Sequence, residues 1–162
     1  MLDDQDDSSF EMEAGGSLGL PPPEALEHGL STRLSALTQF HSTRRLESSR
    51  QYARIRSEVD RIMSTVIGEN FRSLDLRSTG PLRATAWNIE RGLQVEGVIE
   101  ALRHHPRMRH SDVLFLTELD FGMARSGNRC VAREIARGLG LNYAFANCYI
   151  SLVKGSGLES EI

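Results

Sequence analysis

Two polar residues, Asn88 and Glu118, each stand at the carboxyl end of a mostly apolar stretch, residues 82–89 and 112–119, that predicts a β-strand. A carboxylate at the mouth of a sheet is a natural ligand for a hard cation. Mg²⁺ in particular is usually held by one or two carboxylates, while substrate phosphate and water complete its octahedron. A neighbouring amide can orient a phosphate oxygen or a water molecule. These residue types indicate metal-assisted chemistry on a phosphate, provided that the fold brings them together.

The segment between the two predicted strands has the pattern of a short helix. Residues 93–105 carry one apolar face, and Pro106 stops the pattern; the face consists of Val95, Val98, Ile99 and Leu102. A strand, a crossover helix and a second strand in one sheet normally form a right-handed unit with parallel strands. Both strands then end at the same edge, where ligands of open α/β sheets bind. We therefore expect Asn88 and Glu118 to converge.

The pattern continues in the same order after the second strand. Residues 112–119 form the nearly continuous apolar run of a strand buried on both faces. Residues 128–139 carry an apolar helical face that Gly140 should end, and residues 142–150 predict a further strand. The order β-α-β-α-β predicts an α/β fold with parallel neighbours and crossover helices. Residues 151–162 show no clear element.

The first half of the chain has a different character. Residues 1–23 are acidic and contain Gly15-Gly16 and three consecutive prolines, which predicts a disordered tail. Residues 24–40 carry an apolar stripe typical of one helix. A stronger stripe, from Tyr52 to Val66, predicts a second helix that Ser48 or Ser49 caps and Gly68 ends. We therefore divide the chain into a tail (1–23), a helical extension with linker (24–80) and an α/β part (81–162).

Composition restricts the class of protein without indicating its chemistry. The chain has 162 residues, with 19 Lys and Arg against 22 Asp and Glu and a formal net charge of −3. Cys130 and Cys148 are too few for a disulfide scaffold or a four-cysteine zinc site, and we expect free thiols. No apolar run reaches the length of a membrane span, and the acidic start is unlike a signal peptide. We expect a soluble, cytoplasmic protein.

Three segments of the α/β part resemble a known family. They are residues 86–90 (AWNIE), 112–120 (DVLFLTELD) and 139–145 (LGLNYAF), and the likeness covers roughly residues 82–149. They resemble the endonuclease/exonuclease/phosphatase superfamily, the deoxyribonuclease-I-like metal-dependent phosphoesterases. In that family an Asn closes the first strand and a Glu, usually in a Gln-Glu pair, closes the second. Asn88 and Glu118 match these positions, with Thr117 where Gln is usual.

The resemblance implies a fold, a cofactor and roles for both residues. The fold would be the N-terminal half of a two-sheet α/β/β/α sandwich, and the cofactor Mg²⁺ or Mn²⁺. Glu118 would hold the ion, while Asn88 would orient the scissile phosphate and act on the metal indirectly. The substrate would be a phosphate ester of a nucleic acid, a phospholipid or an inositol phosphate, and the sequence does not choose among them.

Part of the family's active site has no counterpart after Tyr149. The family continues with an Asp-x-Asn segment, a His paired with an Asp and a terminal Asp-His pair, whereas the last His here is His110. We therefore expect an N-terminal fragment that is inactive alone, because loss of a general base typically removes about 10²–10⁴ in rate. Half a sandwich would also leave a sheet face and an edge strand uncovered, which favours self-association.

Other residues have both a functional and an ordinary interpretation. Asp120 and Arg125, in the loop after the second strand, could contact substrate, or Arg125 could be one more surface arginine. Asn88 could be a turn residue at a strand end, and Glu118 an exposed acid. The basic tract 103–110 contains three histidines, and we interpret it as cations that favour a helix C-terminus rather than as a metal site.

Two alternatives to a phosphoesterase fragment stay open. In the first, the helical segment 24–67 is a non-catalytic module that binds a partner, and the α/β part is a degenerate remnant. In the second, the chain has an unrelated α/β fold with a site for a small ligand. A structure with Asn88 and Glu118 at opposite ends of the sheet would favour the second alternative.

Overall fold

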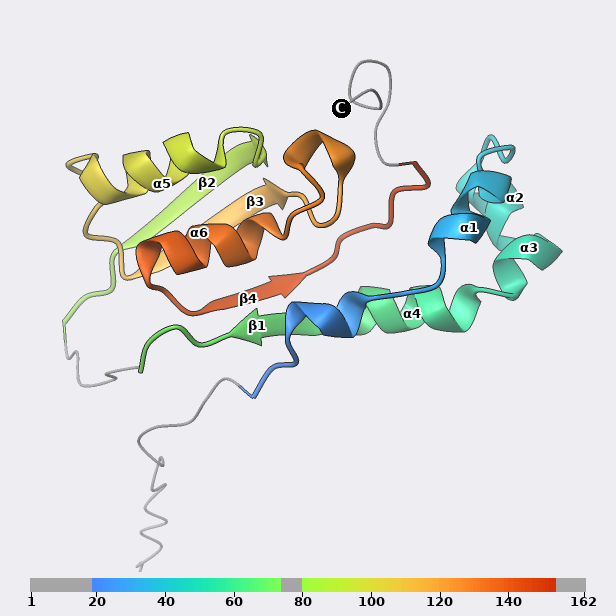
Figure 1. Cartoon of the computed structure of the whole chain (residues 1–162), viewed down its shortest axis with the longest axis horizontal. Coiled ribbons are helices and arrows are strands. Elements are labelled where there is room, and N and C mark those ends of the chain that lie inside the picture. The colour runs from blue at the N-terminus through green and yellow to red at the C-terminus, as the bar shows by residue number, and fades with distance from the viewer. Residues whose placement is uncertain (1–18, 74–79, 154–162) are drawn as a thin grey trace, which may run out of the picture.

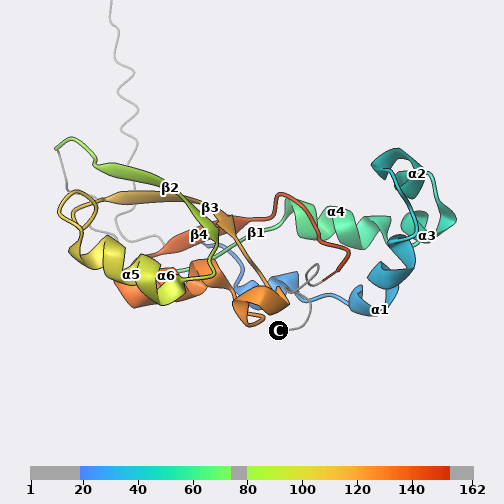
Figure 2. The same cartoon turned by 90° about the horizontal axis from the view of Figure 1, so that it is seen from above.

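The computed structural model of the chain describes residues 19–73 and 80–153. Within these ranges the protein is mixed α/β, with helices α5 and α6 on one side of the strands (Figures 1 and 2). Most of the predicted acidic tail, residues 74–79 of the predicted linker and residues 154–162 lie outside the described residues. No helix in the described ranges is long and apolar enough to cross a membrane.

The predicted strand-helix-strand unit is present. Strand β2 (Ala84–Arg91) is followed by helix α5 (Val95–His104) and strand β3 (Val113–Leu119). The two strands pair in parallel, and Asn88 lies opposite Thr117. Apolar side chains that alternate along both strands face α5, while the residues between them face outward, which is the period of two expected of strands.

The second crossover continues to a strand with an unexpected partner. Helix α6 (Val131–Leu139) ends at Gly140, whose φ of 64° is left-handed, and strand β4 (Tyr143–Ala146) follows. Strand β4 pairs antiparallel with strand β1 (Val66–Glu69). The four strands of the described ranges thus form two hydrogen-bonded pairs, β2 with β3 and β1 with β4. Strand β1 ties the segment before residue 80 to the α/β part.

The single helix predicted over residues 24–40 is wrong. The segment contains the short 3-10 helix η1 (Pro23–Leu26), α1 (Ser31–Leu34) and the 3-10 helix η2 (Ser35–Leu37), and α2 (Thr43–Glu47) follows it. Between η1 and α1, the ring of His28 accepts the Leu30 N–H at 3.1 Å, a local bond that competes with helical pairing. Gly29 adds backbone freedom there. The apolar stripe itself is buried, although the helix is interrupted.

The second predicted helix is present in two pieces and ends earlier than expected. Helix α3 (Arg50–Ala53) begins at Ser49, whose hydroxyl accepts the Tyr52 N–H at 3.0 Å, and α4 (Arg56–Ser64) follows after a break. The predicted end at Gly68 is wrong, because Val66 and Gly68 belong to β1. A β-branched run at residues 65–67 favours a strand. At Gly68 a Cβ atom would clash with the Tyr143 carbonyl, so the strands approach there only because this residue is glycine.

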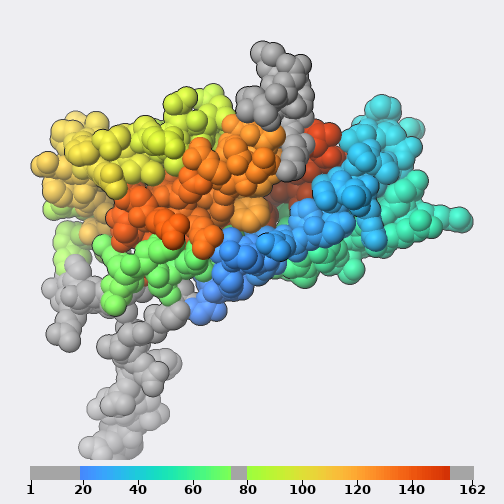
Figure 3. Space-filling model, viewed as in Figure 1, coloured from blue at the N-terminus to red at the C-terminus, as the bar shows by residue number. Residues whose placement is uncertain are grey.

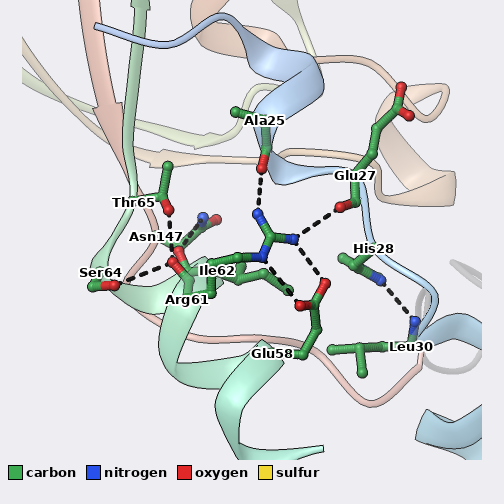
Figure 4. Close-up of polar contacts among 10 residues, drawn as sticks. All are labelled: Ala25, Glu27, His28, Leu30, Glu58, Arg61, Ile62, Ser64, Thr65 and Asn147. Carbon is green, nitrogen blue, oxygen red and sulfur yellow. Dashed lines mark hydrogen bonds and ion pairs between the residues drawn. The ribbon is translucent and has the colours of Figure 1, made fainter.

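Arg61 fastens the N-terminal segment to α4 (Figure 4). Its guanidinium donates to the carbonyl oxygens of Ala25, at 2.5 Å, and Glu27, at 2.9 Å. It also pairs with Glu58 at 2.7 Å, one turn away on the same helix. This hydrogen bond from Arg61 holds the pKa of the Glu58 carboxyl below its ordinary value. One side chain thus satisfies carbonyl groups at the end of η1 that no helix continues.

The apolar interior consists of two clusters. One lies between α5, α6 and the β2–β3 pair; its buried members are Ile89, Val95, Val98, Leu102, Val131 and Ile135. The other lies between the N-terminal helices and the β1–β4 pair; its buried members are Leu26, Leu30, Leu37, Ile55, Ile62 and Ile67. In Figure 3 the N-terminal segment, in blue, lies between α6, in orange, and α4, in blue-green. The helical extension is therefore packed on the strands.

Candidate functional site

Asn88 and Glu118 meet at the carboxyl edge of the β2–β3 pair. The Asn88 carboxamide donates a hydrogen bond from Nδ2 to Oε1 of Glu118, and the two atoms are 2.9 Å apart. Both side chains are exposed. The parallel pairing of β2 and β3 brings their ends together, although thirty positions separate the two residues in the sequence. The site is therefore accessible and already ordered by an internal hydrogen bond.

A left-handed backbone turns Glu118 toward Asn88. Leu114 and Leu116 pack against the helix-facing cluster, so regular alternation would place residue 118 on that same buried face. Glu118 instead has a φ of 57°, which non-glycine residues rarely adopt, and its side chain is exposed. The strand pairing shifts at the same place, between Asn88 and Arg91. Local backbone strain of this kind concentrates at functional sites.

The turn after β2 holds the other side of Asn88. The Oδ1 atom of Asn88 accepts the Glu90 N–H at 3.0 Å, so both ends of the carboxamide are engaged. Glu90, Arg91 and Gly92 have φ values of 49°, 65° and 72°, a left-handed turn. A Cβ at Gly92 would clash with Val131 at the start of α6. The turn is therefore packed closely against the second crossover helix, which fixes the orientation of the Asn88 amide.

Asp120 and Arg125 contact each other in the loop after β3. Arg125 donates from Nε and Nη2 to the two carboxylate oxygens of Asp120 at 2.7 and 2.8 Å. The side chains are 10% exposed for Arg125 and 6% for Asp120, so this is a buried, two-point ion pair. Asp120 also accepts the Val131 N–H on its carbonyl oxygen. The pair thus anchors the chain two residues after Glu118, and the substrate contacts expected of both residues stay a prediction.

The donor set at this edge fits a hard cation in part. The exposed Glu118 carboxylate uses Oε1 for Asn88, and its second oxygen is available as a ligand atom of the type that Mg²⁺ prefers. The oxygen of Asn88 is occupied by the Glu90 N–H, which suits an indirect role. Among residues 19–73 and 80–153, no three His, Cys, Asp or Glu side chains gather as a metal cluster. A metal here would depend on Glu118, with other ligands from water and phosphate.

A polar cluster that the sequence patterns did not indicate joins β1, α6 and β4. Arg133 pairs with Glu69 at 2.6 Å, and the Tyr143 hydroxyl donates to the same carboxylate at 3.2 Å. Burial, followed by the nearby Cys130 and Glu69, raises the pKa of Tyr143, and burial also raises that of the Cys130 thiol. These residues come from three elements, and only the unpredicted pairing of β1 with β4 brings them together. Cys130 and Cys148 are both free, as expected.

Comparisons with known proteins identify no relative of this chain, so the function of the site is inferred from its geometry. No protein-family model, no curated protein and no solved structure matches this chain. The expectation drawn from residues 86–90, 112–120 and 139–145 is therefore carried forward as a proposal. Its physical support is the meeting of Asn88 with Glu118 at adjacent strand ends.

Proposed function

We propose that this chain carries the N-terminal part of a divalent-metal-dependent phosphoesterase that hydrolyses phosphodiester or phosphomonoester bonds. The hydrogen bond between Asn88 and Glu118 carries the proposal. It orders an amide donor and a carboxylate ligand at the edge of a parallel strand pair where α/β proteins bind ligands. The left-handed backbone at Glu118 adds support, because it turns toward solvent a carboxylate that regular alternation would bury.

The two residues have separate roles in the proposal. When bound, Mg²⁺ or Mn²⁺ would polarise the phosphoryl oxygens and stabilise the leaving oxygen. Glu118 would hold the ion through its second carboxylate oxygen. Asn88 would keep Glu118 in place through Nδ2 and help to orient the scissile phosphate. The buried pair of Asp120 with Arg125 would hold the strand end that carries Glu118.

The two-sheet α/β/β/α sandwich belongs to the same proposal. The outward face of the β2–β3 pair carries Ala84, Ala86 and Phe115 uncovered, and Phe115 is 61% exposed. Such an apolar face fits a layer that a second sheet covers. The helical extension gives less support to a free partner-binding module, because its apolar stripe is already buried against β1 and β4.

A metal titration followed by NMR tests the proposal on the whole 162-residue chain. Paramagnetic Mn²⁺ added below stoichiometric amounts should broaden the Asn88 side-chain amide signals first, since this group lies beside the Glu118 carboxylate. Glu118→Gln should abolish the selective broadening. Glu47→Gln, which removes an exposed carboxylate on α2, is the matched control and should change nothing. Broadening that is uniform over the exposed acids, or unchanged in Glu118→Gln, would contradict the proposal.

Residues 1–162 alone should bind the metal without turnover. The His-Asp and Asp-His motifs expected of the family have no counterpart after Tyr149, and we therefore expect the general base to be missing from these residues. We expect no hydrolysis of bis-p-nitrophenyl phosphate above the rate of Mg²⁺ in buffer. Mg²⁺-dependent hydrolysis that Glu118→Ala removes would show the chain to be active by itself, and this part of the proposal would be wrong.

A further inference from the structure

A hollow lies at the end of the β2–β3 pair opposite to Asn88 and Glu118, where both strands begin. Its volume is about 510 Å³, within the range of small-ligand pockets. Its lining contains five basic residues, which are Arg72, Arg83, Arg103, Arg109 and His110. About 17 Å of strand separates Arg83 from Asn88, at about 3.3 Å per residue. The hollow is therefore distinct from the site formed by Asn88 and Glu118.

Positive charge in this hollow is only partly neutralised. Asp112 is its one acidic lining residue, and its carboxylate accepts the backbone N–H of Arg83 at 2.8 Å. The Arg103 guanidinium already has partners within the protein. It donates to the Gly138 carbonyl at the end of α6, and its Nη1 atom lies 3.7 Å from Oε1 of Glu100. The exposed guanidinium groups of Arg72, Arg83 and Arg109 form no ion pair within residues 19–73 and 80–153.

The arrangement of these three arginines is not explained by the ends of helices. Cations near a helix C-terminus are favourable against the dipole, and Arg103 has that role for both α5 and α6. Arg72 and Arg83 lie outside any helix, and Arg109 follows α5 by five residues. Basic groups that surround a concave surface concentrate a field that attracts anions.

The lining of the hollow is mainly polar, with a smaller apolar part. Leu114 from β3 and Leu139 from α6 belong to this apolar part, together with Leu141 and Met108, and all four are half-buried rather than fully covered. A ligand that fits both parts has an anionic group for the arginines and a small apolar body for these four side chains. Guanidinium forks bind phosphate oxygens at two points, and a phosphate monoester carries up to two negative charges near neutral pH.

We propose that this basic hollow binds a small organic phosphate, with the phosphate on Arg83 and Arg109, Arg72 nearby in the lining, and the organic body on the half-buried apolar side chains. The site needs no divalent metal and does not depend on the function proposed for Asn88 and Glu118. Binding should weaken as salt is added, because the contacts between the ligand and these exposed arginines are screened.

Isothermal titration of the whole chain with phenyl phosphate, in low salt with EDTA, tests the proposal. EDTA removes any contribution from metal at Glu118, so failure here is distinguishable from failure of the phosphoesterase proposal. Wild-type protein should bind one equivalent, and inorganic phosphate should bind at least tenfold more weakly. The double variant Arg83→Gln/Arg109→Gln and the single variant Arg72→Gln should each weaken phenyl phosphate binding, the double variant by at least about tenfold.

The matched control is Arg44→Gln/Arg45→Gln, which removes the same charge from exposed residues of α2 at the other end of the molecule. Its affinity should equal that of wild type. Circular dichroism melting curves establish that each variant is folded. The proposal is overturned if wild type shows no saturable binding, if both double variants lose affinity equally, or if inorganic phosphate binds as tightly as phenyl phosphate.

Discussion

The Nδ2 atom of Asn88 lies 2.9 Å from Oε1 of Glu118, and this contact joins the ends of two parallel strands. Glu118 reaches it only because its backbone is left-handed, with a φ of 57°. A side chain that is exposed, strained and hydrogen-bonded to a neighbouring strand end is costly to keep for stability alone. Because of this hydrogen bond and the strained backbone, Glu118 is the first residue to substitute in a test of function.

The backbone strain at Glu118 predicts that a glycine variant is more stable than an alanine variant, the opposite of the order expected in a regular strand. Glu118→Gly and Glu118→Ala both remove the hydrogen bond to Asn88, so the difference between them reports the backbone. We expect the glycine variant to be more stable by about 1 kcal/mol, measured as the free energy of unfolding in urea, because only glycine adopts positive φ without cost. At Thr117, in the regular strand, the order should reverse, with alanine the more stable. The same order at both positions would refute strain at Glu118.

Alanine substitutions at Gly92 and Gly122 should distinguish the stability cost of a steric clash from the cost of backbone strain. Both have positive φ, 72° and 65°, but a Cβ at Gly92 would clash with Val131, whereas nothing lies within 4 Å of one at Gly122. Gly122→Ala should cost about 1 kcal/mol of unfolding free energy for the backbone alone. Gly92→Ala should cost about 3 kcal/mol, since the close packing of the turn on α6 must also give way. Equal costs in urea denaturation would show that this turn is not packed on α6.

The buried pair of Asp120 with Arg125 predicts a large effect on stability. Asp120→Ala deprives a guanidinium that is only 10% exposed of its carboxylate and should lower the free energy of unfolding by about 3 kcal/mol. Arg56→Ala, which removes the exposed pair with Asp60 at 3.7 Å, should change it by less than about 1 kcal/mol. Equal small effects would mean that the loop after β3 does not need the ion pair.

The α/β half could be predicted from sequence because its patterns are local and agree with one another. Strand β2, helix α5 and strand β3 each differ from their predicted bounds by two residues or fewer at either end, and Gly140 ends α6 as expected. The meeting of Asn88 with Glu118 follows from the parallel pairing of the two strands in a strand-helix-strand unit. The conformation of Glu118 could not be predicted, since glutamate carries no signal for a left-handed backbone.

Strand β1 could not be predicted because its identity depends on a distant partner. Val66 extends the apolar spacing of the preceding helix, so the β-branched run at residues 65–67 is a weak local signal, and the pairing with β4 decides for a strand. The contact of Glu69 with Arg133 depends on the same pairing. The N-terminal helices are shorter than their apolar stripe predicts for a related reason, since the buried stripe is present without a continuous helix. Periodicity predicted which side chains are buried better than it predicted the backbone.

The contact between Arg61 and Glu58 predicts a pH-dependent contribution to stability. The pKa of Glu58 is below its ordinary value in the folded protein because Arg61 hydrogen-bonds to the carboxylate. A lowered pKa of an acid stabilises the folded state above the unfolded pKa, and this stabilisation is lost as the pH falls through the folded pKa. Glu58→Gln should therefore lower Tm at pH 7 and have progressively less effect below about pH 4.5. Glu47→Gln is the control, and a constant effect of Glu58→Gln at every pH would contradict the linkage.

The uncovered face of the β2–β3 pair predicts self-association of this chain. Phe115 lies opposite Ala86 on that face and is 61% exposed, and Leu82 just before β2 is 70% exposed. Apolar surface beside a strand edge favours contact with a second copy. Sedimentation velocity should show a concentration-dependent increase in mass that Phe115→Thr reduces. Tyr149→Thr, which removes an aromatic side chain that is 69% exposed outside the strand pair, should leave the association unchanged. Wild-type protein that stays a monomer at every concentration would mean that this face does not self-associate, and the proposal of a sandwich half with one open face would lose its main physical support.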